Sequence, residues 1–164
     1  MKISILIACL ALVLDQLSKW YVLTILHLDD LSSVLVVPPI LFFTIAWNRG
    51  ADFGVLSSDF PMVKWLWIGL AAAISIGLLN HYRSNASKIT KIGVGLIVGG
   101  ALSNATDRLV YGAVLDFLNF QLFWVHNPYS FNLADAFIFI GVGLLTFSMK
   151  SLSTSGDMKA HSGS

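Results

Sequence analysis

The sequence has no glutamate, and charged residues of every kind are scarce. Only 12% of its 164 residues are charged, whereas hydrophobic residues make up 56%. A soluble domain carries about 25% charged residues, so this composition favours a membrane protein. The net charge of +1 provides no electrostatic attraction to nucleic acid, and we expect no nucleic-acid partner.

Cysteine is also nearly absent, because Cys9 is the only one, so no intrachain disulfide can form. The stretch Leu6-Ile7-Ala8-Cys9 is similar to a bacterial lipoprotein cleavage box. However, the apolar run before Cys9 is shorter than a signal-peptide core of about 7–15 residues with its cleavage box. The hydrophobic stretch also continues past Cys9 to Leu14. We therefore expect Cys9 to be a buried apolar residue.

Four segments are long and apolar enough to cross about 30 Å of hydrocarbon. The last two contain several glycines, which let membrane helices pack closely. The predicted fold class is a membrane protein, mainly α, with one domain over residues 1–150 and a disordered, Ser-rich cytoplasmic tail over 151–164. The predicted transmembrane helices cover about residues 3–26, 62–79, 92–109 and 133–149.

Basic residues indicate the orientation, because they are enriched in cytoplasmic loops. Arg49 and Arg108 lie on one side of the predicted bundle, with Lys64 near its boundary. A larger group lies on the opposite side, which is therefore cytoplasmic and holds both termini. That group consists of Lys2, Arg83, Lys88, Lys91, Lys150 and Lys159.

Two long segments then lie outside the membrane. Residues 27–61 contain two runs of β-branched and aromatic residues, 34–37 and 40–45, which predict a small extracytoplasmic β element. Residues 110–131 are rich in aromatics, which is typical of an interfacial loop at the lipid–water boundary. Within it, we expect residues 117–124 to cover a substrate as a lid.

Polar residues of the predicted bundle gather on its outer half, and several of them have purely structural interpretations. Asp15 and Lys19 have the i, i+4 spacing at which side chains can pair on one face of a helix. Asn132 and Asp135 match a helix N-cap and an acid at the third helical position. The whole set is Asp15, Gln16, Lys19, Asn48, Arg49, Gly50, Asp52, Asn104, Asp107, Arg108, Asp116, Asn132 and Asp135.

Asp116 and Asp135 differ from the other acids, because each is framed by apolar residues and has no adjacent basic residue. Two carboxyl groups brought together share one proton. The ionised group can take a proton from water while the protonated group donates to a carbonyl, which is the chemistry of an aspartic peptidase. His and Cys are not clustered at metal spacing, so we expect neither a metal nor a cofactor.

Two other functions stay open at this point. Paired acids in a membrane can also relay ions, as in a small transporter or proton-relay subunit, although a relay usually needs acids at several depths. The three later predicted helices carry no acid in their middle or inner parts. Alternatively, the chain is a structural assembly factor and its polar residues have no catalytic role.

Four ordered blocks of sequence resemble the bacterial lipoprotein signal peptidase (signal peptidase II) family, and the resemblance covers about residues 3–150. Ser103 stands where the family usually has glycine, and Asp52 is an additional acid in the second block. The blocks are Asp15-Gln16-Leu17-Ser18-Lys19, residues 48–54 (NRGADFG), residues 99–108 continuing to Val114-Leu115-Asp116-Phe117, and Phe131-Asn132-Leu133-Ala134-Asp135.

The resemblance implies an aspartic endopeptidase of the bacterial inner membrane, in contact with membrane lipids, and we expect it to act as a monomer. Such an enzyme removes signal peptides from diacylglyceryl-modified prolipoproteins, cutting on the amino side of the lipidated cysteine near the outer membrane surface. Asp116 and Asp135 match its catalytic pair. Asp107 is the rival acid, and we expect the adjacent Arg108 to hold it as a plain carboxylate. The residues implied to bind substrate or support the site are Asn48, Gly50, Asn104, Asp107, Arg108 and Asn132, with Asp15 and Lys19 as a structural polar pair.

Overall fold

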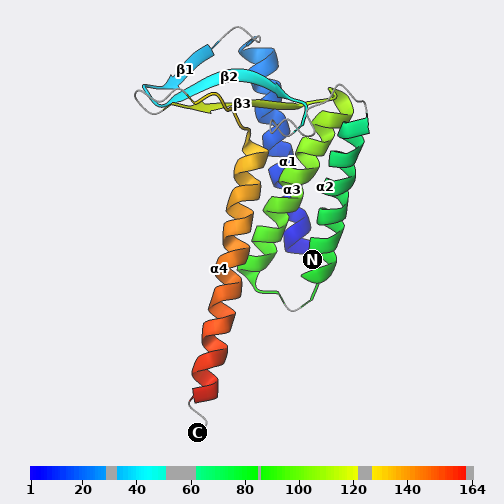
Figure 1. Ribbon diagram of the computed structural model, residues 1–164, viewed down its shortest axis with the longest axis vertical. Coiled ribbons are helices and arrows are strands. Elements are labelled where there is room, and N and C mark those ends of the chain that lie inside the picture. The colour runs from blue at the N-terminus through cyan, green and yellow to red at the C-terminus, as the bar shows by residue number, and fades with distance from the viewer. Residues whose placement is uncertain (29–32, 51–61, 85, 122–126, 162–164) are drawn as a thin grey trace.

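The computed structural model describes residues 1–28, 33–50, 62–84, 86–121 and 127–161. Four helices form a bundle, and a small sheet lies across one end of it, here called the sheet end (Figure 1). Helix α3 is central and contacts each of the other three helices. The helices are α1 (Lys2–Trp20), continued by a π-helical turn η1 (Tyr21–Ile25), α2 (Met62–His81), α3 (Lys88–Val110) and α4 (Leu133–His161).

The first three predicted spans are confirmed as apolar helices of sufficient length to cross a membrane. Helix α4 has a shorter apolar part, Leu133–Met149, so its length alone does not establish a fourth span. The helix continues to His161, where the sequence predicts a disordered tail. Each residue added to an existing helix gains a backbone hydrogen bond, and no proline interrupts residues 151–161.

Glycines bring α3 and α4 into close contact, as their composition predicts. A Cβ atom on Gly93 would lie 2.9 Å from the carbonyl oxygen of Gly141, and one on Gly100 would lie 2.5 Å from that of Ala134. Both distances are too short for any side chain, so only glycine permits this packing. Gly143 differs, because nothing lies within 4 Å of its Cβ position. The contact of Gly100 fixes the first turn of α4 against α3.

The predicted β element is confirmed by two antiparallel strands, β1 (Ser33–Val37) and β2 (Leu41–Asn48). A third strand, β3 (Val114–Phe120), pairs with β2 and corrects the prediction of an interfacial loop there. Its pairing partner is distant in sequence, so no local turn signal predicts it. Phe117 is 2% exposed within a core that includes Val22 and Leu115, so it is not part of a lid. Residues 122–124 of the expected lid lie outside the described residues.

Cys9 is exposed, and the expectation that it is buried was wrong. Helix α1 buries one stripe of side chains that includes Ala8 and Ala11. Successive residues of a helix are rotated by about 100°, so Cys9 points away from that stripe. Its neighbour Leu10 is exposed as well, which places both side chains on the outer surface of the bundle.

Candidate active site

Two groups of acidic residues lie at the sheet end, and the first is organised by a lysine. Lys19 Nζ lies 2.5 Å from Asp15 Oδ2 and 2.7 Å from Asp107 Oδ2. The pairing of Asp15 with Lys19 that the sequence predicts is therefore confirmed, and a second acid joins it from α3. All three side chains are buried, so we call Asp15, Lys19 and Asp107 the lysine cluster.

Asp107 does not pair with Arg108, and that expectation was wrong. Consecutive residues on a helix do not face each other. Asp107 instead accepts hydrogen bonds from Gln16 Nε2 at 2.7 Å and from the backbone N–H of Leu115 at 3.1 Å. Its two oxygens thus connect α3 with α1 and with the start of β3. Asp107 is therefore paired with a cation and hydrogen-bonded to two other elements, which fits a structural role better than a catalytic one.

Asp15 connects α1 to the other two helices of the site. Its Oδ1 accepts the backbone N–H of Ala134 at 2.9 Å, which satisfies an otherwise unpaired donor in the first turn of α4. Its Oδ2 accepts a hydrogen bond from Ser103 Oγ at 2.7 Å. Ser103, the departure from the family pattern, also accepts a hydrogen bond from Gln16 Nε2 at 3.0 Å. The lysine cluster therefore holds α1, α3 and α4 together.

The second group contains Asp116 from β3 and Asp135 from α4, and asparagine side chains surround it. Asn132 Nδ2 donates to Asp116 Oδ1 at 2.6 Å, and Asn48 Nδ2 donates to Asp116 Oδ2 at 3.2 Å. Asn104 Nδ2 donates to Asp135 Oδ1 at 2.9 Å. We call these five residues the amide cluster. Neither carboxylate has an ion-pair partner within the part of the chain that the structure describes.

Asn132 connects the two carboxylates of the amide cluster. Its Oδ1 accepts the backbone N–H of Asp135 at 2.9 Å, and Asp135 Oδ2 accepts the backbone N–H of Asn132 at 3.3 Å. This reciprocal pair confirms the predicted N-cap of α4. The side chain of Asn132 also donates to Asp116. Asn132 therefore caps α4 and contacts a proposed site residue at the same time.

Burial controls the protonation of Asp116, which is 3% exposed. Removal from water is the main cause that raises the pKa of Asp116 to about 7, and the nearby charge of Asp135 raises it further. The hydrogen bond from Asn48 acts in the opposite direction, because it stabilises the carboxylate. A group with this pKa exchanges its proton near neutral pH, as general acid–base chemistry requires.

Gly50 and Arg108 support the neighbours of the two carboxylates. The backbone N–H of Gly50 donates to Asn48 Oδ1 at 3.1 Å, which fixes the orientation of that amide. Arg108 Nη1 donates to the carbonyl oxygen of Asn104 at 3.3 Å. Arg108 also lies over the ring of Trp67 in α2, a contact that sequence reasoning missed because no local spacing connects the two residues. Asp52 lies outside the described residues.

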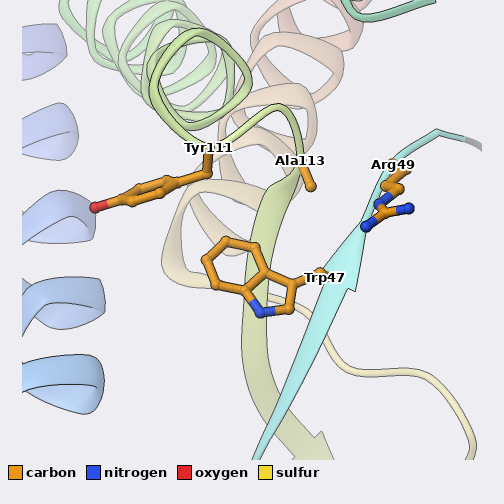
Figure 2. Close-up of a pocket in the computed structure, with 4 residues that line it drawn as sticks. All are labelled: Trp47, Arg49, Tyr111 and Ala113. Carbon is orange, nitrogen blue, oxygen red and sulfur yellow. The ribbon is translucent and has the colours of Figure 1, made fainter. Parts of the chain in front are cut away.

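A cavity of about 370 Å³ lies near the end of α3 and the paired strands β2 and β3 (Figure 2). Trp47, Arg49, Tyr111 and Ala113 line it, and the rings of Trp47 and Tyr111 are 5.5 Å apart. Side chains alternate between the faces of a strand, so Trp47 points away from the face that carries Asn48. Neither Asp116 nor Asp135 lines this cavity.

Comparison with known proteins shows the family. Residues 7–151 match the family described as Signal peptidase (SPase) II. The chain belongs to the signal peptidase II family. It is 38% identical over 151 residues to the lipoprotein signal peptidase of Rhodopseudomonas palustris strain TIE-1, covering 89% of this chain and 90% of the relative. It is 39% identical over 140 residues to that of Neisseria meningitidis serogroup C, covering 84% and 83%.

A solved structure of a bacterial membrane enzyme, obtained by the in meso method at 2.3 Å resolution, has a similar fold. Its TM-score is 0.79 at 28% sequence identity, and the match covers 94% of this chain and 92% of that one. The described residues of the four blocks that carry the family resemblance lie far apart in the sequence, yet they meet at the sheet end. Among the described residues, no three His, Cys or acidic side chains form a group that could hold a metal ion.

Proposed function

We propose that this signal peptidase II family member is an aspartic endopeptidase that removes signal peptides from diacylglyceryl-modified prolipoproteins, cutting on the amino side of the lipidated cysteine. The relatives it is similar to are lipoprotein signal peptidases. The observation that carries the catalytic assignment is that one residue, Asn132, donates to both carboxylates, with its side-chain amide to Asp116 and with its backbone N–H to Asp135. Neither acid forms an ion pair in the described part of the chain, and we infer that the two carboxyl groups share one proton.

The chemistry follows from the sharing of that proton. The ionised carboxylate of the pair removes a proton from water as the water oxygen attacks the scissile carbonyl carbon. The protonated carboxyl donates its proton to the carbonyl oxygen, which gives a neutral tetrahedral intermediate. When the C–N bond breaks, the leaving amine takes the proton gained from water, and the intermediate's hydroxyl returns its proton to the other carboxylate. The pair is then back in its starting state.

The proposed enzyme has four membrane spans and both termini in the cytoplasm. The N-terminus and the end of α4 lie at the end of the bundle away from the sheet (Figure 1). Arg83 and Lys88 flank the connection between α2 and α3 at that same end, which is the pattern expected of a cytoplasmic face. The sheet end, with Asp116 and Asp135, then faces the outer surface of the bacterial inner membrane.

The proposed domain covers residues 1–150, and a monomer suffices because one chain supplies every proposed site residue. Transporter or proton-relay function is not favoured. In the described parts of the helices, α2 carries no acid, and the only acid of α3, Asp107, lies at the sheet end. A relay would need acids at several depths.

The test is cleavage of a synthetic prolipoprotein peptide by the purified protein in detergent. We expect cleavage of the diacylglyceryl-modified peptide and none, or far less, of the same peptide without lipid. Activity should persist in the presence of a strong chelator, since a carboxylate activates the water. Loss of activity on chelation that zinc restores would refute the aspartic mechanism, and equal cleavage of the two peptides would refute the proposed substrate class.

A further inference from the structure

Two buried N–H groups without hydrogen-bond acceptors lie together at the sheet end, where α2 contacts α3. Within the described residues, neither Trp67 Nε1 nor Arg108 Nε has a hydrogen-bond partner. The guanidinium carbon of Arg108 lies 5.6 Å from the centre of the Trp67 ring. Buried donors without acceptors are rare in folded proteins, because each forfeits its hydrogen bonds to water. A pair of them therefore indicates a ligand that supplies acceptors.

The two side chains cannot satisfy each other. Indole and guanidinium groups are donors only, so whatever completes this site must be an acceptor. The guanidinium also makes a cation–π contact with the ring of Trp67. The structure thus places two donors in a fixed arrangement between α2 and α3.

The surroundings limit what the acceptor can be. On one side, Arg108 Nη1 donates to the carbonyl oxygen of Asn104, whose amide holds Asp135. On the other side, the first turns of α2 are apolar and uncovered, since Trp65 is 57% exposed and Leu66 is 56% exposed, and α2 is apolar and long enough to cross a membrane. The site therefore adjoins the catalytic pair and the hydrocarbon at once. An uncharged acceptor attached to acyl chains meets both conditions.

We propose that Trp67 and Arg108 bind an ester carbonyl oxygen of the diacylglyceryl group on the substrate cysteine, and that the acyl chains lie along the exposed side of α2. This subsite rests on the proposed function. An ester carbonyl accepts hydrogen bonds and donates none, and it brings no charge into an apolar region. The glycerol is attached to the cysteine beside the scissile bond, so its esters are within reach of a site next to Asp135.

The experiment compares two substrates in a detergent that contains no ester. One peptide carries the diacylglyceryl group on its cysteine, and the other carries a dialkylglyceryl group, in which ether oxygens replace the esters. The enzymes are the wild type, Trp67→Phe, and Trp65→Phe as the matched control. Trp67→Phe keeps an aromatic ring over Arg108 but removes the indole N–H. Trp65→Phe removes an indole N–H from an exposed position of the same helix.

We expect wild type and Trp65→Phe to cleave the diester peptide about 3- to 10-fold more efficiently than the diether peptide, measured as kcat/KM. For Trp67→Phe, the ratio of kcat/KM for the diester peptide to kcat/KM for the diether peptide should fall toward one. The fall should come from less efficient cleavage of the diester peptide, while cleavage of the diether peptide is unchanged. A merely structural part for Trp67 would lower both efficiencies equally, and this result would overturn the subsite while leaving the peptidase assignment in place.

Further outcomes separate the subsite from its alternatives. A ratio of one in the wild type would overturn the subsite even if the variants proved unstable. Dependence of the Trp67→Phe effect on added ester phospholipid would assign the two donors to a bound membrane lipid, and would also overturn it. Failure of the wild type to cleave either peptide would refute the proposed function, and the subsite with it.

Discussion

The lysine cluster and the amide cluster lie at the same end of the bundle, and each contains two buried aspartates. In the lysine cluster, Asp15 and Asp107 share the ammonium group of Lys19. In the amide cluster, Asp116 and Asp135 receive only neutral N–H groups. The ammonium group balances the charge of the buried carboxylates in the lysine cluster, whereas the neutral donors of the amide cluster compensate a buried carboxylate only in part. We therefore assign a structural role to the aspartates of the lysine cluster and a catalytic role to those of the amide cluster.

The same comparison explains why Asp107 is the weaker candidate for catalysis. Its partners come from α1 and from the backbone of Leu115, so it fixes the position at which β3 begins. Asp116 follows Leu115 on that strand. The lysine cluster therefore aligns the strand that carries one half of the proposed catalytic pair.

The largest expected effect is the loss of turnover when the amide cluster loses either carboxylate. Asp116→Asn and Asp135→Asn should each reduce single-turnover cleavage by at least about 10³-fold, because an amide cannot take a proton from water. The double variant should be little worse than either single one, since the two residues act as a unit. Circular dichroism and thermal unfolding should show that all three variants remain folded.

Asp107→Asn and Asp15→Asn serve as the matched comparisons in the lysine cluster. We expect Asp107→Asn to lose much but not all of the activity, because β3 is held less firmly. Asp15→Asn should mainly lower stability, by about 1–3 kcal/mol. Near-normal turnover of Asp116→Asn together with an inactive Asp107→Asn would mean that the catalytic pair is wrongly chosen.

The next largest effect concerns the stability that Lys19 provides. Lys19→Met leaves two carboxylates buried without a cation, so it should cost about 3–5 kcal/mol in the free energy of unfolding. Adding Asp15→Asn and Asp107→Asn to Lys19→Met should recover part of this loss, because the unpaired charges are then removed. Lys64→Met, at the start of α2, is the control and should have little effect. Equal stability of Lys19→Met and wild type would contradict the distinction between the clusters.

Local spacing predicted the parts of the site whose contacts are close in sequence. The Asp15–Lys19 pair and the Asn132–Asp135 cap each span one helical turn, and the structure has both. The three apolar helices of membrane-spanning length and the first two strands follow from hydrophobic runs in the same way. These features need no knowledge of the tertiary arrangement.

Contacts between distant elements were not predictable from such spacing. Strand β3 forms because β2 is available for pairing, and Lys19 reaches Asp107 because α1 lies against α3. The expected pairing of Asp107 with Arg108 failed for the opposite reason, since neighbours in sequence diverge around a helix. The contact between Trp67 and Arg108 is likewise tertiary. Without the fold, only the family resemblance predicts that residues from the four blocks form one site.

A smaller effect on stability is expected at the contact between α3 and the first turn of α4, next to both clusters. Gly100→Ala places a Cβ atom 2.5 Å from the carbonyl oxygen of Ala134 and 2.8 Å from Ile138 Cγ1, which must push α4 away from α3. We expect a loss of about 1–3 kcal/mol in stability. Activity should fall as well, since Asp135 lies in the displaced turn. Gly69→Ala is the control, because nothing lies within 4 Å of its Cβ position.

The smallest expected effect is a change in the pH dependence of the amide cluster. The pair needs one proton, and the pKa of Asp116 is raised to about 7, so kcat/KM should fall as the pH rises through this value. Asn48→Ala removes a hydrogen bond that favours the carboxylate, so it should raise the pKa of Asp116 and move the midpoint to higher pH. Asn119→Ala, on the strand that carries Asp116, is the control, since the side-chain amide of Asn119 donates to the carbonyl oxygens of Asn127 and Tyr129. A midpoint that stays fixed or moves to lower pH in Asn48→Ala would show that Asp116 does not govern this titration.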